Sequence, residues 1–557
     1  MGLSRRAFIG GAASAGMVAA CARPLRTAAA SGHGAVASSQ RAATDAGIEI
    51  LRGGGNAADA AVAMAAALNV TEPSSTGLGG DCFALHYGAA TGAITALNGS
   101  GRAPARLTLD LLRARGLSEL PPESAHTVTV PGACAGWCDL LERHGSLPRA
   151  TVLAPAIRLA EEGFPVGEIT AHFWDVGLSR HPEATNIGEL SIDGRAPRAG
   201  ERFRNPGLAR ALRAVADGGK DAFYRGDIAA AIVRVLEQNG GVMSREDLAA
   251  HESTWDEPIS TTYRGLRVWE CPPNGQGITA LVALNILEGF DLGGQDPLGA
   301  ERFHLLVEAM RLAFADTRWY VADPRATRVP IAELLAKPYA ARRRALIDPR
   351  RAAADVRRGA PVAASDTVYF CVVDGRGNAC SFINSNYMGF GTGLVPKGWG
   401  FTLQNRGHCF ALDPAHPNAL APRKRPYHTI IPGMLTRADG TLWGPFGVMG
   451  GFMQPQGHVQ VVVALVDDAA SPQAAVDRPR FCIEPVDGAG KLKLEEGVPA
   501  ATGAALGALG HDVEVGVSGF DRAVFGRGQV IRRDPDGKLV AGSDPRADGY
   551  AAIVEGA

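Results

Sequence analysis

Apolar residues recur at helical spacing along much of the first 350 positions, with short runs of strand-like alternation between them. The pattern predicts a helix over 37–52 that ends at the glycines 53–55, and Asn56 is placed to cap an alanine-rich helix after them. Amphipathic helices are further expected over 152–162, 206–217, 228–239 and 300–316, and strands over 82–87 and 266–270. The chain shows no internal repeat.

The pattern changes at residue 350. Residues 350–366 are rich in Arg, Ala, Pro and Ser and lack apolar periodicity, which predicts an exposed linker. Directly after it, residues 367–373 are β-branched and aromatic, 374–378 form a turn, and 379–386 return as the second strand of a hairpin. The linker therefore meets a buried hairpin at the bond between Asp366 and Thr367.

The first thirty residues predict an export signal. The twin arginines Arg5 and Arg6 precede a small apolar run, 8–20, which is far shorter than the roughly 20 residues that span a bilayer. Residues 18–21 resemble a lipobox, in which Cys21 would carry a lipid, and a signal cleaved near 28–30 is the alternative. We expect an exported, periplasmic protein whose membrane attachment, if it has one, is a lipid on Cys21.

Composition narrows the class of protein. The chain has 557 residues, and its 56 Lys and Arg nearly balance its 57 Asp and Glu, so it lacks the basic excess of a nucleic-acid binder. A hydrophobic content of 46% supports a full core, and residues 57–70, apolar nearly all round, predict a buried helix.

Cysteine and histidine spacing does not indicate a metal or a cofactor. Nine cysteines occur without a CxxC pair, and Cys134 and Cys138, one turn apart on an expected helix over 132–143, are interpreted as buried apolar residues. The histidines near residues 408–458 lack metal-ligand spacing. We predict neither a metal nor a cofactor.

Thr367 has two interpretations. The simpler one is an ordinary strand threonine. If the chain were cut before Thr367, however, its free α-amine, with a reference pKa of roughly 8, could act as the base for its own hydroxyl. Such a nucleophile needs no histidine and no distant triad member.

Residues 366–374, with 377–379 and 390–393, resemble the maturation site of the γ-glutamyltransferase (glutathione hydrolase) family. Further motifs similar to that family follow in the same order along the chain, at 53–61, 78–80, 102–104, 221–226, 263–265, 424–426, 450–451 and 543–546. Each motif alone is weak, but their order is specific.

The resemblance implies an N-terminal-nucleophile hydrolase of the α+β class, with a four-layer αββα sandwich formed from a self-cleaving precursor. Residues 31–366 would become a large subunit and 367–557 a small one, together forming one αββα unit. Thr367 would attack the carbonyl of Asp366 to release itself, and would later carry the acyl group. By the same resemblance, Gly450 and Gly451 would form the oxyanion hole and Ser385 would support the nucleophile.

The substrate pocket departs from the family. The serines that hold the glutamyl carboxylate are replaced by His428 and Thr429, and the place of the arginine falls near Ser100, with Arg102 as its candidate substitute. The residues that hold the α-amine become Tyr387, Arg406 and Cys409. Because an acid is lost and a cation gained, the pocket is expected to receive an ammonium poorly. Residues 412–425 look too short for the lid loop of some relatives.

The leading hypothesis is an exported, self-processing γ-glutamyltransferase or glutathione hydrolase that passes an acyl group from a γ-glutamyl or related amide to water or an amine acceptor. The alternative is a cephalosporin- or glutaryl-acylase-like amidohydrolase on the same fold. A third class is an unprocessed, non-catalytic lipoprotein, against which the presence of Thr367, Gly450 and Gly451 argues.

Overall fold

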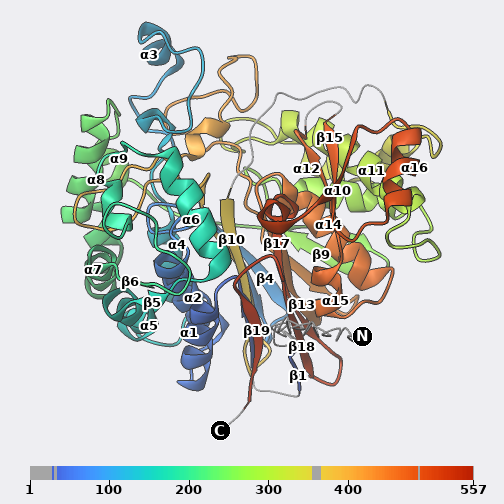
Figure 1. Ribbon diagram of the computed structural model, residues 1–557, viewed down its shortest axis with the longest axis horizontal. Helices are drawn as coiled ribbons and strands as arrows, with labels where there is room; N and C mark the ends of the chain where they lie inside the picture. Colours follow the sequence, from blue (N-terminus) through green and yellow to red (C-terminus); the bar gives the residue numbers. More distant parts are fainter. Residues whose placement is uncertain (1–27, 31–33, 354–365, 487–489, 556–557) are drawn as a thin grey trace, which may run out of the picture.

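The computed structural model describes residues 28–30, 34–353, 366–486 and 490–555; most of the expected signal, with Arg5, Arg6 and Cys21, and most of the expected linker lie outside these ranges. Two antiparallel seven-stranded sheets face each other at the centre (Figure 1). The first contains, in spatial order, β19 (Tyr550–Val554), β2 (Gly34–Ser38), β10 (Asp366–Val373), β11 (Ala379–Tyr387), β3 (Asp81–Gly88), β4 (Ala93–Gly99) and β7 (Thr254–Asp256). The second contains β1 (Ala28–Ala30), β18 (Leu539–Ser543), β17 (Arg527–Arg533), β13 (Leu442–Met449), β12 (Gly433–Thr436), β9 (Leu266–Glu270) and β8 (Ile259–Tyr263).

Helices cover the outer face of each sheet (Figure 1). Against the first sheet pack α1 (Arg41–Arg52), α2 (Ala57–Thr71), α4 (Ala133–His144), α5 (Arg149–Glu162), α7 (Pro206–Tyr224) and α8 (Asp227–Gln238). Against the second pack α10 (Gly277–Leu287), α11 (Ala300–Tyr320) and α14 (Met453–Val466). A third apolar cluster fills the space between the sheets. The predicted four-layer αββα fold is therefore confirmed.

The helix α2 is buried on every side, as its composition predicts. Asn56 caps it: its side chain accepts hydrogen bonds from the amides of Ala58 and Asp59, and the Asp59 carboxylate accepts one from the amide of Asn56 in return. The small side chains of α2 let it lie directly beneath the first sheet, with α1, α4 and α5 around it.

The helix predicted over 37–52 begins only at Arg41, and that part of the prediction is wrong. Residues Gly34–Ser38 form β2, a central strand between β10 and β19, in which Ala37 pairs with Cys371. Alanines satisfy helical spacing and also fit a strand buried on both faces, so the local pattern cannot separate the two, and the neighbouring strands decide. The other predicted helices are found as α5, α7, α8 and α11.

The predicted hairpin is found as β10 and β11, joined by a tight turn. Both fragments expected from a cut before Thr367 contribute strands to both sheets. In the first sheet β10, β11 and β19 lie among β2, β3, β4 and β7, and in the second β12, β13, β17 and β18 share a sheet with β8 and β9. In the described part of the chain, no helix is long and apolar enough to cross a membrane. Cys134 and Cys138 are both buried on α4, as expected.

Candidate active site

Thr367 lies at the edge of the space between the two sheets. Along β10, Val368 and Phe370 pack under the helices of the first layer, whereas Tyr369 belongs to the core between the sheets. Side chains alternate along a strand, so Thr367 points to the same side as Tyr369. Its side chain is buried, and its Oγ1 lies 3.0 Å from Oγ of Ser385 in β11.

The pairing of β10 with β11 changes register between Asp366 and Val368, at the predicted cleavage bond. Such irregularities bend a strand and often lie beside active sites, where they redirect a side chain. Here the shift frames Thr367, and the hydroxyl of Ser385 meets that of Thr367. The structure thus places the predicted supporting residue beside the predicted nucleophile.

A buried guanidinium adjoins this pair. Arg406 lies on a short 3-10 turn, η3 (Arg406–Cys409), and is 0% exposed. Its Nη2 donates to Oγ of Ser385 (3.1 Å), its Nη1 donates to Oγ1 of Thr429 (2.7 Å), and its Cζ lies 4.2 Å from the centre of the Tyr387 ring. Among the described side chains no carboxylate makes an ion pair with Arg406, and its Nε has no hydrogen-bond partner. Among the described side chains, the direct contacts of this guanidinium are therefore two hydroxyls and an aromatic ring.

Cys409 lies close to Arg406 in the chain and contacts the tyrosine that packs on it. It lies on the same turn as Arg406, is 6% exposed and contacts Tyr387. Burial, and then Cys409, raises the pKa of the Tyr387 hydroxyl well above its usual range, so that hydroxyl stays neutral. Tyr387 has φ 78°, a left-handed conformation that a bulky residue seldom adopts outside strained or functional sites.

His428 adjoins a carboxyl group that the sequence analysis missed. Its Nε2 donates to Oδ2 of Asp81 (3.1 Å), while Oδ1 of Asp81 accepts from the amides of Gly101 (3.1 Å) and Gly132 (3.2 Å). Burial raises the pKa of Asp81 to about 7, against the opposing effect of Arg406. Burial, then Arg406, lowers the pKa of His428 well below its usual range, so its ring is neutral. The available signal was the position of Asp81 directly after the motif 78–80, at the start of a strand.

Gly450 and Gly451 directly follow β13. The end of β13 that they follow lies at the same end of the two-sheet sandwich as Thr367. At the opposite end the Tyr87 hydroxyl donates to the carbonyl oxygen of Gly440 (3.4 Å). Midway, the Tyr369 ring packs on Gly447, where a Cβ would lie 2.5 Å from the ring. The strand β13 thus runs from the Tyr87 side towards Thr367.

Positive φ angles of 132° and 59° require glycine at Gly450 and Gly451. A second residue that the sequence analysis missed, Gln276, fixes this loop: its Nε2 donates to the carbonyl oxygens of Gly451 (2.9 Å) and Thr429 (2.7 Å). The loop is thereby tied to the residue that holds Arg406. A side-chain amide at the start of a buried helix carries no sequence signal for this role.

Arg102 lies apart from this group. It is partly exposed, and its Nη1 donates to the carbonyl oxygen of Glu252 (3.4 Å). Ser100, near which the family arginine is expected, is buried and bonded to Asn98 and Asn274. Within the described residues Arg102 makes no hydrogen bond or ion pair with the other predicted site residues, whereas Arg406 contacts Ser385, Thr429 and Tyr387.

A cleft of about 770 Å³ opens beside Gly450. Its walls include Met449 and Phe452 near the glycine loop, and Phe173 and Phe520 farther out. The cleft is large enough for a substrate group of drug-like size.

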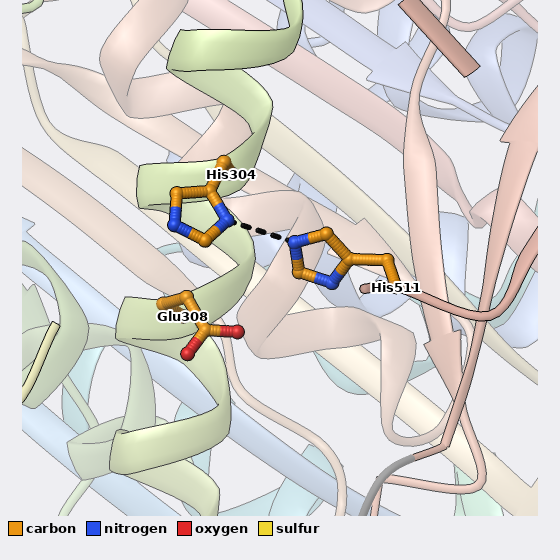
Figure 2. A group of neighbouring side chains, drawn as sticks. All are labelled: His304, Glu308 and His511. Carbon is orange, nitrogen blue, oxygen red and sulfur yellow. Dashed lines mark hydrogen bonds between the residues drawn. The ribbon is translucent and has the colours of Figure 1, made fainter. Parts of the chain in front are cut away.

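Three potential metal ligands meet elsewhere, His304 and Glu308 on α11 and His511 after α16 (Ala500–Ala508) (Figure 2). Their ligand atoms lie within 4.8 Å of one another. The two rings bond directly, His304 Nδ1 to His511 Nε2 (2.8 Å), and Arg311 donates to the Glu308 carboxylate (3.1 Å). Hydrogen bonds account for this cluster, and the guanidinium would oppose a divalent cation there.

Two facing antiparallel sheets between helical layers, with Thr367 as the second residue of a central strand, form the arrangement of the N-terminal-nucleophile hydrolases. The chain belongs to the gamma-glutamyltranspeptidase family, whose model matches residues 43–554. It is an enzyme of that family, made as a self-cleaving precursor.

Three relatives illustrate the range of the family. The chain is 39% identical over 521 residues to the glutathione hydrolase-like YwrD proenzyme of Bacillus subtilis, covering 92% of this chain and 97% of that one. It is 36% identical over 529 residues to the oxamate amidohydrolase proenzyme of Klebsiella pneumoniae, covering 93% and 98%. The crystal structure of cephalosporin acylase from Bacillus halodurans superposes with a TM-score of 0.88 at 46% identity, covering 95% and 97%.

Proposed function

We propose that the mature protein hydrolyses amides whose acyl group bears a carboxylate and lacks an α-ammonium, glutaryl amides being the model class. The observation that carries this proposal is Arg406, a buried cation beside Thr367 with no carboxylate partner among the described side chains. A buried charge is stabilised by an opposite charge, and a guanidinium binds carboxylates through paired hydrogen bonds.

Thr367 acts twice in this scheme. In the precursor its Oγ attacks the carbonyl carbon of Asp366; the C–N bond breaks, the α-amine of Thr367 takes up a proton, and water hydrolyses the resulting ester. In the mature enzyme the free α-amine accepts the hydroxyl proton while Oγ attacks the substrate amide. The amine product leaves with that proton, and water or an acceptor amine then takes the acyl group from Thr367.

The glycine loop serves both steps. Gly450 and Gly451 follow β13 at its Thr367 end, and glycine at both positions would let backbone amides rather than side chains face the reacting centre. Amides directed at the developing oxyanion stabilise it best when they are already held in place before the reaction. The hydrogen bonds of Gln276 to this loop and to Thr429 provide that rigidity.

The neighbours of Arg406 favour this acyl class over γ-glutamyl. A γ-glutamyl group carries an α-ammonium, which the Arg406 guanidinium would repel and which neither Cys409 nor Tyr387 can neutralise as a carboxylate would. Two relatives support the proposal by their names, an oxamate amidohydrolase and a cephalosporin acylase. The cleft beside Gly450 would receive the amine half of the substrate.

A substrate panel on the mature enzyme tests the proposal. We expect kcat/KM for glutaryl p-nitroanilide to exceed that for γ-glutamyl p-nitroanilide by at least about tenfold, because one ion pair gained or lost is worth roughly that factor. Arg406→Gln combined with Cys409→Asp should reverse the preference, since the two positions are close enough to act together. Arg102→Gln, away from the pocket, is the matched control and should leave the ratio unchanged. A wild type that already prefers γ-glutamyl, with a double variant that loses that preference, would contradict the proposal.

We also infer export to the periplasm from the twin arginines Arg5 and Arg6. Replacing both by lysine should retain the chain in the cytoplasm, because the twin-arginine pattern is read by its receptor rather than acting as an anchor. Cell fractionation measures this, and Cys21→Ala is the comparison: release of that variant from the membrane fraction would establish a lipid anchor. Unchanged export of the lysine variant would show that the segment is not such a signal.

A further inference from the structure

Asp81 adjoins both residues that hold Arg406. In the register of the first sheet, Asp81 of β3 lies opposite Ser385 of β11, whose Oγ accepts from the guanidinium. On its other side Asp81 accepts from His428, which directly precedes Thr429, the second acceptor of Arg406. All five side chains are at most 1% exposed.

This group contains a buried cation without a directly bonded anion. Arginine remains protonated at every ordinary pH, so Arg406 cannot relieve its burial by losing a proton. Of the charged groups that act on the Asp81 carboxyl, Arg406 is the strongest. Desolvation makes such an interaction stronger than it would be in water, even without direct contact.

We propose that Asp81 is the counter-ion of Arg406 in the empty site, and that the carboxylate of the acyl donor competes with it for the guanidinium. The inference rests on the proposed function and adds how substrate affinity is set. An ionised Asp81 neutralises the site and weakens donor binding. When Asp81 is protonated, the charge of Arg406 is not compensated, and donor binding becomes stronger.

The groups that face Asp81 determine the pH at which it loses its proton, and this pH lies near neutrality. Burial raises the Asp81 pKa to about 7, while Arg406 and the amides of Gly101 and Gly132 oppose the rise. His428 is neutral because burial lowers its pKa well below the usual range. Arg425 remains protonated, since burial lowers its pKa only to about 9. Binding of an anionic donor should therefore weaken as pH rises through 7, where Asp81 loses its proton.

The α-amine of Thr367 also titrates in this region, but it acts on a different kinetic constant. As the base for the hydroxyl it governs the chemical step, and kcat should rise with pH as the amine loses its proton. Asp81 governs binding and should appear in KM. Measuring KM and kcat separately therefore distinguishes the two groups.

The experiment compares KM for glutaryl and valeryl anilides between pH 6 and 8.5 on the mature enzyme. Valeryl has the same chain length without the carboxylate. For the wild type we expect the glutaryl KM to rise about tenfold across this range, as one competing charge implies, and the valeryl KM to stay level. In Asp81→Asn the glutaryl KM should stay low and should not change with pH. Glu270→Gln, which alters a buried carboxylate bonded to His458 elsewhere, should behave as the wild type.

A second variant protects the test if Asp81→Asn is poorly folded. Arg406→Gln removes the cation, so the glutaryl KM should be high and should not change with pH. Persistence of the wild-type slope in Asp81→Asn would overturn the counter-ion role while leaving the carboxylate preference intact. Persistence of the slope in Arg406→Gln would show that Arg406 does not bind the donor and would overturn both. A wild type that treats glutaryl and valeryl donors alike at pH 6 would instead overturn the proposed function, and this inference with it.

Discussion

Replacing Thr367 by alanine should leave a full-length chain without activity. In the proposed scheme the Thr367 hydroxyl forms the ester that frees the α-amine and later forms the acyl-enzyme, so its loss would remove both steps at once. Gel electrophoresis should show one band for Thr367→Ala and two for the wild type. N-terminal sequencing of the smaller wild-type fragment should begin Thr-Val-Tyr-Phe-Cys. Any other first residue would refute the assignment of the nucleophile.

Two comparisons separate chemistry from folding in this experiment. Thr367→Ser keeps a hydroxyl and should process, although slowly. Ser385→Ala removes the group 3.0 Å from the Thr367 hydroxyl and should slow processing, whereas Ser381→Ala, farther along the same strand and bonded to Tyr369, should not. Equal slowing by both serine variants would point to general damage to the hairpin.

Replacing Gly451 by valine should reduce the acyl-transfer rate by about 10²- to 10³-fold, the loss typical of one missing oxyanion donor. Gly451 has φ 59°, a conformation in which a β-branched residue is strained, so the backbone amides of the loop must turn away from the reacting centre. The change should appear in kcat for a glutaryl anilide, with a smaller effect on KM. Near-normal turnover would show that the oxyanion is stabilised elsewhere.

The control for this variant is Gly440→Val. Gly440 also has a positive φ, 83°, and no atom lies within 4 Å of the position of an added Cβ. It lies just before β13, at the end opposite Gly451. The same residue change thus imposes similar backbone strain far from Thr367. It should lower the thermal midpoint and leave kcat unchanged, so a rate loss in both variants would trace to stability.

Local chemistry explains the parts of the fold that sequence reasoning predicted correctly. The β10–β11 hairpin is set by neighbouring residues, a β-branched run, a turn and a returning strand. The start of α2 is likewise set by Asn56 and Asp59, which satisfy the first free amides of that helix. The start of α1 could not be found in this way, because pairing with β10 and β19 decides whether the alanines of Gly34–Ser38 form a strand.

The sequence indicated the candidate nucleophile because the residues around Thr367 are contiguous, and residues 366–374 resemble the maturation site of the γ-glutamyltransferase family. The electrostatics of the pocket could not be predicted in this way, since these depend on groups far apart in the chain. Arg406 acquires its role only when η3 places it against Ser385 of β11 and Thr429 before β12. Burial, which only the packing of distant segments creates, raises the pKa of the Asp81 carboxyl to about 7. The sequence therefore indicated the candidate nucleophile, and the tertiary structure decided which charges surround it, because burial and long-range contact set the strength of a charge.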